Sequence, residues 1–361
     1  MKIVIATDAW DPQTNGVVTT LKATIDTLQS WGHEIRVISP QGMFTIPCPS
    51  YPEIRLAIAP GRYIARELGG FRPHAIHVAT EGPIGLAMRR YCRRHGLPFT
   101  TSYHTRYPEY LRARWPIPIG VSYAWLRRFH GSAARTFVSN ESLRAQLAGK
   151  GFEHLHIWQR GVNLERFRPD AGPVPSELSG VPRPIMAYMG RVAVEKNLEA
   201  FLRLDVPGTK VLIGNGPQRA ELAERYPQAM LVGYRFGDEL AAMLGAADVF
   251  VFPSLTDTFG LAMIEALACG VPVAAFPVPG PLDVIEPGVT GVLHDDLANA
   301  IRSALKLDRR LCAERAATYT WGAATEQFLA GLEPVPASTR SGLAVPRHSA
   351  MIAGNAARRE G

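Results

Sequence analysis

Two carboxylates stand eight residues apart in the stretch FPSLTDTFGLAMIEALACG, residues 252–270. Asp257 lies in the loop that follows an apolar strand. Glu265 is the one charged residue of an otherwise apolar helix, which the pattern predicts over residues 261–269. An ionised acid on such a helix is unfavourable unless a hydrogen-bond donor reaches it, and sugar hydroxyls are suitable donors. The pair therefore indicates a site for a hydroxyl-rich ligand.

The start of this helix is a second candidate binding feature. We expect its first turn near Phe259, where backbone N–H groups and Gly260 allow an anion to approach closely. Two structural interpretations remain open: Asp257 or Thr258 only caps the helix, or Glu265 faces a buried arginine. Two acids placed around an anion-binding helix start favour a ligand over either of them.

Two cations follow the apolar stretch PIMAYMG. Arg191 comes directly after Gly190, and Lys196 follows five residues later beside a predicted helix start. A guanidinium fork and a lysine point charge suit a doubly charged diphosphate. The alternative, that both are solvated surface cations, is equally open.

Glycines open two more loops between strands and helices. Asn15 and Gly16 precede a helix, where a glycine lets backbone N–H groups approach an anion, but a tight turn explains them as well and is favoured. Gly214 and Gly216 match part of a dinucleotide fingerprint, but the third glycine is missing and no acid follows at the right distance. A structural turn is the better interpretation there.

One histidine also follows a predicted strand. His104 lies in PFTTSYHTRYPEY together with Tyr103 and Arg106. Its place at a strand end, at the expected mouth of the cleft, is compatible with a contact with substrate or a catalytic role. A structural or surface histidine is the ordinary alternative.

These features share one position, the carboxyl end of a strand. A helix is expected over residues 17–31, and a linker rich in Pro and Gly interrupts the pattern over 160–185. We expect strands at 2–7, 34–39, 74–79, 98–104 and 134–139 before the linker, and at 184–190, 209–216, 229–234, 247–254 and 271–276 after it. Two such runs predict two doubly wound α/β domains that face each other across a cleft, with ligands bound at the strand ends.

The composition is that of a globular protein with a moderate positive charge. Of the 361 residues 47% are hydrophobic, and the net charge of +7 permits an anionic ligand or membrane without selecting one. The four cysteines form no CxxC pair, which argues against zinc and a disulfide framework and fits a reducing cytosol. The first residues do not read as a signal peptide, and no stretch reaches the roughly 20 apolar residues of a membrane span.

Taken in order, the motifs resemble those of the family 4 (group 1) nucleotide-sugar glycosyltransferases of GT-B fold. The similarity covers the chain up to about residue 332 and rests on the Asn-Gly loop, SYHT, RGV…F.P, GR…EKN, G.GP and PS…FGL..IEALA.G.PV. The last block resembles the family's Glu-x7-Glu signature with Asp257 as its first acid, which keeps the charge but shortens the reach by one methylene. Asn163 stands where the family often has Asp.

The resemblance also implies the domain organisation. An acceptor-binding domain is expected over 1–165, a linker over 166–183 and a nucleotide-sugar-binding domain over 184–317. Residues 318–332 are expected to cross back onto the first domain, and 333–361 to form a disordered tail.

Roles for single residues follow from the resemblance as well. Arg191 and Lys196 would neutralise the leaving diphosphate, and Glu265 would hold the ribose. Asp257 and the backbone of Thr258, Phe259 and Gly260 would hold the transferred sugar, with His104 near it. The phosphates would approach the backbone of Asn15, Gly16 and Leu261. The family transfers sugars with retention and uses no metal, so no cofactor is expected.

The acceptor side is less defined. Glu81, Tyr103 and Arg106 are assigned to it, and Arg mixed with Trp and Tyr in the first domain suits docking on anionic lipid headgroups, although solvated arginines on ordinary helices explain the same pattern. The resemblance extends to glycosyltransferases that make mannosyl, glucosyl and sulfoquinovosyl diacylglycerols. We therefore expect GDP-mannose or a UDP-hexose as donor and a lipid acceptor such as diacylglycerol or phosphatidylinositol. The expected location is the cytoplasm, including the inner face of the membrane.

Three other functions fit the sequence less well. A UDP-N-acetylglucosamine 2-epimerase shares the architecture but fits the motifs poorly. A non-catalytic nucleotide-sugar-binding protein would not need Arg191, Lys196 and Glu265 together. No nucleic acid partner is expected, because the arginine clusters are short and no recognised module is present. A soluble or polysaccharide acceptor remains the alternative to a lipid.

Overall fold

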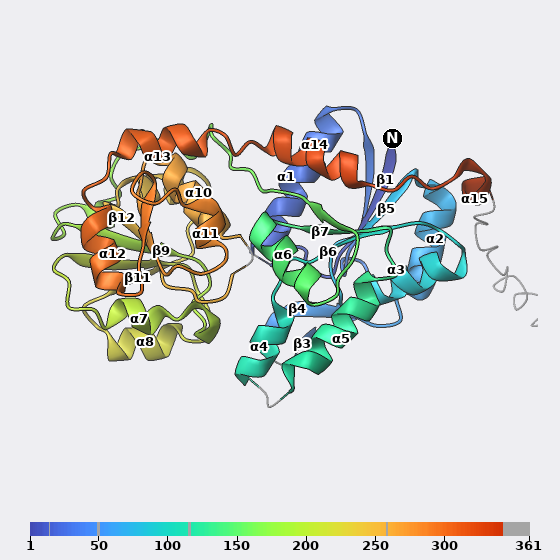
Figure 1. The fold of residues 1–361 in the computed structure, drawn as a ribbon, viewed down its shortest axis with the longest axis horizontal. Coiled ribbons are helices and arrows are strands. Elements are labelled where there is room, and N and C mark those ends of the chain that lie inside the picture. The colour runs from blue at the N-terminus through green and yellow to red at the C-terminus, as the bar shows by residue number, and fades with distance from the viewer. Residues whose placement is uncertain (14, 49–50, 115–116, 258, 342–361) are drawn as a thin grey trace, which may run out of the picture.

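The computed structural model describes residues 1–13, 15–48, 51–114, 117–257 and 259–341. They form two α/β halves, each built around a six-stranded parallel sheet with helices on both faces (Figure 1). The prediction of two doubly wound domains is confirmed.

The first sheet has the strand order β2-β1-β5-β6-β7-β8. Its strands are β1 (Lys2–Ala6), β2 (Glu34–Ile38), β5 (Ala75–Val78), β6 (Thr100–Ser102), β7 (Arg135–Val138) and β8 (Leu155–Ile157). The helices around it are α1 (Gly16–Ser30), α2 (Gly61–Phe71), α3 (Pro83–Arg94), α4 (Tyr107–Arg114), α5 (Ile119–His130) and α6 (Glu141–Gly149). Strands β1 and β5 are apolar except for Lys2 and His77, whereas β6 consists of Thr100, Thr101 and Ser102. Apart from Lys2 these residues are buried, because helices cover both faces of the sheet.

The second sheet has the order β11-β10-β9-β12-β13-β14. Its strands are β9 (Ile185–Met189), β10 (Thr209–Ile213), β11 (Met230–Gly233), β12 (Val249–Phe252), β13 (Val273–Ala275) and β14 (Gly291–Leu293). Its helices are α7 (Leu198–Leu202), α8 (Arg219–Arg225), α9 (Gly237–Gly245), α10 (Leu261–Ala268), α11 (Pro281–Val284), α12 (Leu297–Ala304) and α13 (Arg309–Ala316), with short 3₁₀ turns at Ser176–Leu178 and Val194–Lys196.

Each sheet has a point at which the direction of winding reverses. In the first sheet this point lies between β1 and β5, and in the second between β9 and β12. Loops that leave neighbouring strands there diverge to opposite faces and open a crevice, which is where doubly wound proteins bind ligands.

Four strands were not predicted. An antiparallel hairpin joins β3 (Thr45–Cys48) to β4 (Tyr51–Ala57), and β8 and β14 are edge strands of three residues each. Proline in both hairpin strands hides them in the sequence, and three residues are too few to show an alternating pattern.

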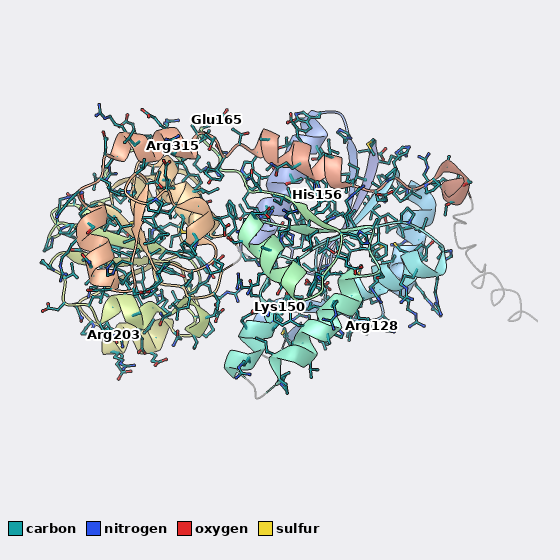
Figure 2. All side chains as sticks on the ribbon, in the orientation of Figure 1. Arg128, Lys150, His156, Glu165, Arg203 and Arg315 are labelled. Atoms are coloured by element: carbon teal, nitrogen blue, oxygen red, sulfur yellow. The ribbon has the colours of Figure 1, made fainter. Side chains whose placement is uncertain are left out.

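The chain crosses between the halves twice, at two points that lie side by side. Val162 on the outward crossing pairs with Thr320 on the return, and a Cβ on Gly161 would come within 2.5 Å of the Trp321 nitrogen. The returning helix α14 (Trp321–Gly331) then packs along α1 (Figure 1). Beneath it lies His156 of β8 (Figure 2), whose Nε2 is 3.0 Å from the Gln327 carbonyl oxygen.

The expectation of a disordered tail from residue 333 is wrong for residues 333–341. Pro334 bridges to Ala75, the buried Val335 donates its N–H to the His74 carbonyl, and α15 (Ala337–Ser341) follows. Backbone hydrogen bonds hold this segment in place. Such bonds leave no apolar periodicity in the sequence from which the segment could be predicted. Residues 342–361 lie outside the described part of the chain.

Candidate active site

A cleft of about 1500 Å³ lies between the two halves. Its walls are the loops that follow β1 and β5 in the first half, and those that follow β9 and β12 in the second. Both winding reversals therefore open into one space.

Most of the predicted site residues line this cleft. Tyr103 and Arg106 do not, because both are buried behind the wall of the first domain. Thr258 lies outside the described residues. The predicted residues on the cleft wall are Asn15, Gly16, Glu81, His104, Arg191, Lys196, Asp257, Phe259, Gly260, Leu261 and Glu265.

The two cations of the second domain are not solvated surface residues. Lys196 Nζ lies 2.7 Å from Asp257 Oδ2, and only 19% and 15% of these side chains are exposed. Arg191 Nη1 lies 4.0 Å from Glu195 Oε1. Loops after β9 and β12 thus hold paired charges at the wall of the cleft, where a ligand anion would meet them.

Helix α10 begins at Leu261, the first residue of the predicted range 261–269 and two residues after Phe259, where its first turn was expected. Gly260 precedes it with φ +84°, and a Cβ there would lie 2.4 Å from Met263 Cε. Asp257 Oδ1 accepts the Phe259 N–H at 3.2 Å, so it stabilises the turn before the helix and does not cap the helix itself. The Met263 N–H donates to the Gly260 carbonyl at 2.9 Å, whereas the Leu261 and Ala262 N–H groups have no hydrogen-bond partner among the described residues and can meet a ligand in the cleft.

Glu265 lies on the cleft side of α10 and is half-buried. Among the described residues its carboxylate has no hydrogen-bond partner. Burial raises its pKa to about 8, against a smaller opposing effect of the Arg166 charge. Arg166 is exposed and pairs with Asp238 at 3.5 Å, so the interpretation of Glu265 as the partner of a buried arginine is wrong.

Gly16 lets the two domains come close together across the cleft. It is the first residue of α1 with φ outside the left-handed region, and Asn15 Oδ1 caps the helix by accepting the Val17 and Val18 N–H groups. A Cβ on Gly16 would lie 3.3 Å from Leu261 Cδ1 across the cleft. The favoured interpretation as a tight turn is therefore wrong. Gly214, by contrast, does meet a structural need, since a Cβ there would lie 2.0 Å from the Gly190 carbonyl oxygen.

His104 is buried against Trp158 and Arg160. Its ring lies edge-on to the Trp158 ring with centroids 5.6 Å apart, and its Nδ1 is 3.2 Å from Arg160 Nη2. Burial and the Arg160 charge hold the pKa of His104 well below its usual range, so the imidazole is neutral. Arg160 was not predicted, although it stands in the RGV motif of the linker.

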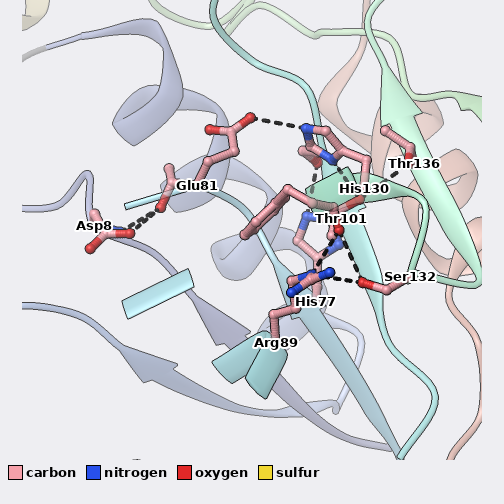
Figure 3. Close-up of polar contacts among 11 residues, drawn as sticks. Asp8, His77, Glu81, Arg89, Thr101, His130, Ser132 and Thr136 are labelled. Carbon is pink, nitrogen blue, oxygen red and sulfur yellow. Dashed lines mark hydrogen bonds and ion pairs between the residues drawn. The ribbon is translucent and has the colours of Figure 1, made fainter. Parts of the chain in front are cut away.

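Two buried acids of the first domain face the cleft, and the sequence pointed to only one of them. Glu81 Oε1 lies 3.2 Å from His130 Nε2, and His130 Nδ1 lies 2.9 Å from Thr101 Oγ1 (Figure 3). Asp8 accepts hydrogen bonds from the Thr80 hydroxyl at 2.9 Å and the Ile84 N–H at 2.8 Å. Asp8 directly follows the first predicted strand pattern, which was the signal available for it.

Two exposed aromatic residues form another part of the cleft wall that was not predicted. Tyr234 and Phe236 follow β11, are 46% and 58% exposed, and stack with ring centroids 5.8 Å apart. Their exposure gives a planar ligand group a surface to stack on.

Two further features, a cluster of metal-ligating side chains and a membrane-spanning helix, are absent from the part of the chain that the structure describes. Within it, no group of three or more His, Cys, Asp or Glu side chains is placed to hold a metal ion. None of its helices is both long enough and apolar enough to cross a bilayer.

Family models match both halves of the chain. Residues 14–166 match the model described as Glycosyltransferase Family 4, and residues 183–307 match Glycosyl transferases group 1. A GDP-mannose-dependent alpha-mannosyltransferase of Mycobacterium tuberculosis is 31% identical over 316 residues, 81% of this chain and 83% of that protein. Sulfoquinovosyl transferase SQD2 of Arabidopsis thaliana is 29% identical over 80% of this chain and 62% of its own length.

Solved structures share the arrangement of both halves. Sucrose-phosphate synthase from Thermosynechococcus elongatus superposes with a TM-score of 0.73 at 20% identity, covering 91% of this chain and 97% of that one. Anabaena HepE in complex with UDP and glucose superposes with a TM-score of 0.67 at 14% identity, covering 91% and 98%. These likenesses show the fold.

Proposed function

Because this chain belongs to the family 4, group 1 glycosyltransferases of GT-B fold, we propose that it moves a hexose from a nucleotide sugar to a membrane glycolipid acceptor with retention of anomeric configuration. One observation carries the proposal. Arg191 and Lys196 lie at the wall of one cleft with the start of α10 and the Glu265 carboxylate, opposite Gly16.

The donor is assigned to the second domain. A diphosphate between Lys196, Arg191 and the N–H groups at the start of α10 meets charge and hydrogen-bond donors together. Glu265 lies about 6 Å further along the helix at 1.5 Å per residue, which suits the ribose of the same molecule. Asp257, held by Lys196, is assigned to the transferred sugar.

The base is assigned to the aromatic pair Tyr234 and Phe236. A purine or pyrimidine has the planar face that such a pair can stack against. We take GDP-mannose as the first donor, because the mycobacterial relative named for it matches over four fifths of this chain, and a UDP-hexose as the second.

The proposed transfer needs no base from the protein. The bond between the anomeric carbon and the diphosphate oxygen breaks, and the acceptor oxygen bonds to the same face of that carbon. The acceptor proton passes to the departing phosphate oxygen. Arg191 and Lys196 stabilise the charge that grows on this oxygen, as preorganised cations do in other transfer reactions.

The acceptor is assigned to the first domain, whose side of the cleft ends in an apolar rim, formed by Ile46, Ile54, Leu56, Val121 and Trp125. Ile46 pairs with Leu56 across the hairpin, and Ile54 shares the face of Leu56 at period two. Val121 and Trp125 of α5 line the same cleft and are 62% and 46% exposed. An apolar surface that runs from solvent into the cleft suits the chain of a lipid acceptor.

Charge near the rim supports the same assignment. Burial lowers the pKa of Arg89, and Arg93 and Arg128 lie close enough to lower it further. Arg128 lies on α5, the helix that carries part of the apolar rim (Figure 2). Cations beside apolar side chains favour an anionic membrane surface over a neutral one.

Consumption of donor by the purified protein tests the proposal. Nucleotide sugars are offered singly with membrane lipid extract, and release of nucleoside diphosphate is measured. We expect GDP-mannose or a UDP-hexose to be consumed, and Lys196→Ala and Glu265→Ala each to lose most turnover, about 10²-fold or more for the lysine. Lys306→Ala, an exposed lysine after α12 and outside the cleft, is the matched control.

Three results would each contradict part of the proposal. Undiminished turnover in folded Lys196→Ala would remove the diphosphate assignment. Nucleotide-sugar binding without consumption, with lipid extract or oligosaccharides alike, would favour a non-catalytic binding protein, and consumption with oligosaccharides alone would move the acceptor into solution.

A further inference from the structure

One partner of His104 is a cation, which is unusual for a histidine at a reaction site. Arg160 and His104 are both buried, with 5% and 7% exposed, and Arg160 Nη2 lies 3.2 Å from His104 Nδ1. A guanidinium has donors and no acceptor, so the Nδ1 lone pair must accept this hydrogen bond.

Arg160 is held in place independently of the histidine. Its Nη1 donates to the backbone carbonyls of Trp158 and Gln159, the latter at 3.2 Å. Its Cζ also lies over the Trp158 ring, 4.7 Å from the centroid. Burial lowers the pKa of Arg160 to about 9, which still leaves it charged at neutral pH. The direction of the donor that meets His104 is therefore fixed by backbone and packing.

The protonation state of His104 follows from this contact. A neutral imidazole whose Nδ1 accepts must carry its proton on Nε2. A second proton is opposed by burial, by Arg160 and by the nearby His77 and His130. In a hydrolase triad the partner of Nδ1 is a carboxylate, which stabilises the cation and makes Nε2 a base. A guanidinium at the same place has the opposite effect.

We propose that Arg160 is a positioning residue that fixes His104 in the Nε2–H tautomer, so that His104 acts as a hydrogen-bond donor toward the transferred sugar and not as a general base. The tautomer follows from the contact alone, whereas its use in transfer rests on the proposed function. Arg160 lies two residues before Val162 of the outward crossing, so the same contact ties the crossing between the domains to the reaction site.

The first test reads the tautomer without any substrate. Protein labelled with ¹⁵N in its ten histidines is observed at neutral pH by long-range ¹H–¹⁵N correlation, and His104→Gln identifies the His104 signals. We expect a protonated Nε2 and an unprotonated Nδ1 in the wild type. A His104 that is protonated on Nδ1, or on both nitrogens, overturns the proposal whether or not the protein is active.

The second test uses Arg160 variants and the donor that the wild type consumes. In Arg160→Met we expect a mixture of tautomers and a kcat about ten- to hundredfold lower, with the donor KM nearly unchanged. Arg160→Lys keeps a cationic hydrogen-bond donor and should restore part of the Nε2–H tautomer and part of the kcat. Arg168→Met, which removes an exposed arginine of the same segment outside the cleft, should change neither.

These outcomes separate the tautomer from its use. If circular dichroism shows that Arg160→Met is misfolded, the Arg160→Lys variant and the wild-type NMR spectrum still test the tautomer of His104. Wild-type kcat in a folded Arg160 variant whose His104 has lost the Nε2–H tautomer would refute the role in transfer. If the wild type consumes no nucleotide sugar, the proposed function fails while the tautomer assignment stands.

Discussion

At the scale of single residues, Glu265 carries the clearest conflict between burial and charge. Its carboxyl pKa of about 8 means that, without a ligand, Glu265 is mostly protonated and neutral at pH 7. Two hydroxyl donors favour the ionised form, so we propose that binding of the ribose releases this proton. A neutral acid in the empty site and an ionised one in the complex make donor binding depend on pH.

The first prediction concerns the direction of this dependence. Between pH 6 and 8, binding of GDP or UDP should strengthen with pH, by up to about tenfold per pH unit, and level off above the pKa. Isothermal titration calorimetry over this range measures the affinity. Glu265→Gln is the control, because it removes the carboxyl while the ionisation of the nucleotide phosphate remains.

The same group gives a stability effect of known sign. Its pKa in the folded protein lies above the ordinary value of 4.5, so the folded state binds the proton that the unfolded chain has lost. Stability should therefore fall as pH rises from about 4.5 to 8, and Glu265→Gln should lessen this fall. Equal pH dependence of binding and of Tm in both proteins would show that Glu265 does not titrate in this range.

At the scale of elements, function lies in the way helix ends face each other across the cleft. The start of α1 in one half meets the start of α10 in the other, at Gly16 and Leu261. Helix α1 does not itself require a glycine at position 16, because Asn15 caps the helix and Gly16 has ordinary backbone angles. The glycine is required by the approach of the other domain.

Gly16→Ala should therefore separate stability from activity. An alanine at this position fits α1 and reduces the conformational freedom of the unfolded chain. The free energy of unfolding should therefore be unchanged or higher by up to about 1 kcal/mol, and Tm should be unchanged or slightly higher. The added methyl group lies 3.3 Å from Leu261 Cδ1 and opposes closure around the diphosphate, so kcat/KM for the donor should fall about tenfold.

A matched helix glycine controls for the substitution itself. Gly70 lies within α2, away from the cleft, with no atom within 4 Å of an added Cβ. Gly70→Ala should leave kcat/KM at the wild-type value. Wild-type kcat/KM in Gly16→Ala would show that the distance between the two helix starts does not limit the reaction.

At the scale of the whole molecule, the sequence predicted the features that follow from short-range pattern. Most of the buried parallel strands are apolar runs, so their positions could be predicted, and with them the loops whose residues line the cleft. The hairpin and the segment around Val335 were missed because backbone pairing with distant strands holds them. Asp8, His130 and Arg160 were missed for a related reason. Their partners Thr80, Glu81 and His104 lie 49 to 72 positions away in the chain, and only the fold brings them together.

The last prediction concerns attachment of the first domain to a membrane. The apolar rim and the arginines beside it lie on the same domain, and this domain also holds the proposed acceptor side of the cleft. Contact with a bilayer through this surface would bring a lipid headgroup to the cleft without any membrane-spanning helix. We expect the protein to float with vesicles that contain anionic lipid, less with neutral vesicles, and less again at high salt, because screening weakens surface charge.

Replacing two rim residues tests whether this surface makes the contact. Val121→Ser with Trp125→Ser should reduce flotation at least about tenfold, since each removed apolar side chain contributes roughly 1.5–3 kcal/mol when fully buried. Leu311→Ser changes an apolar residue of the second domain that is 40% exposed, and it should float like the wild type.

A wild type that stays unbound on anionic vesicles even at low salt would contradict membrane docking. Normal flotation of the double variant would place the contact elsewhere on the molecule. Reduced flotation together with unchanged consumption of donor in detergent would separate docking from chemistry, as expected if the rim only delivers the acceptor.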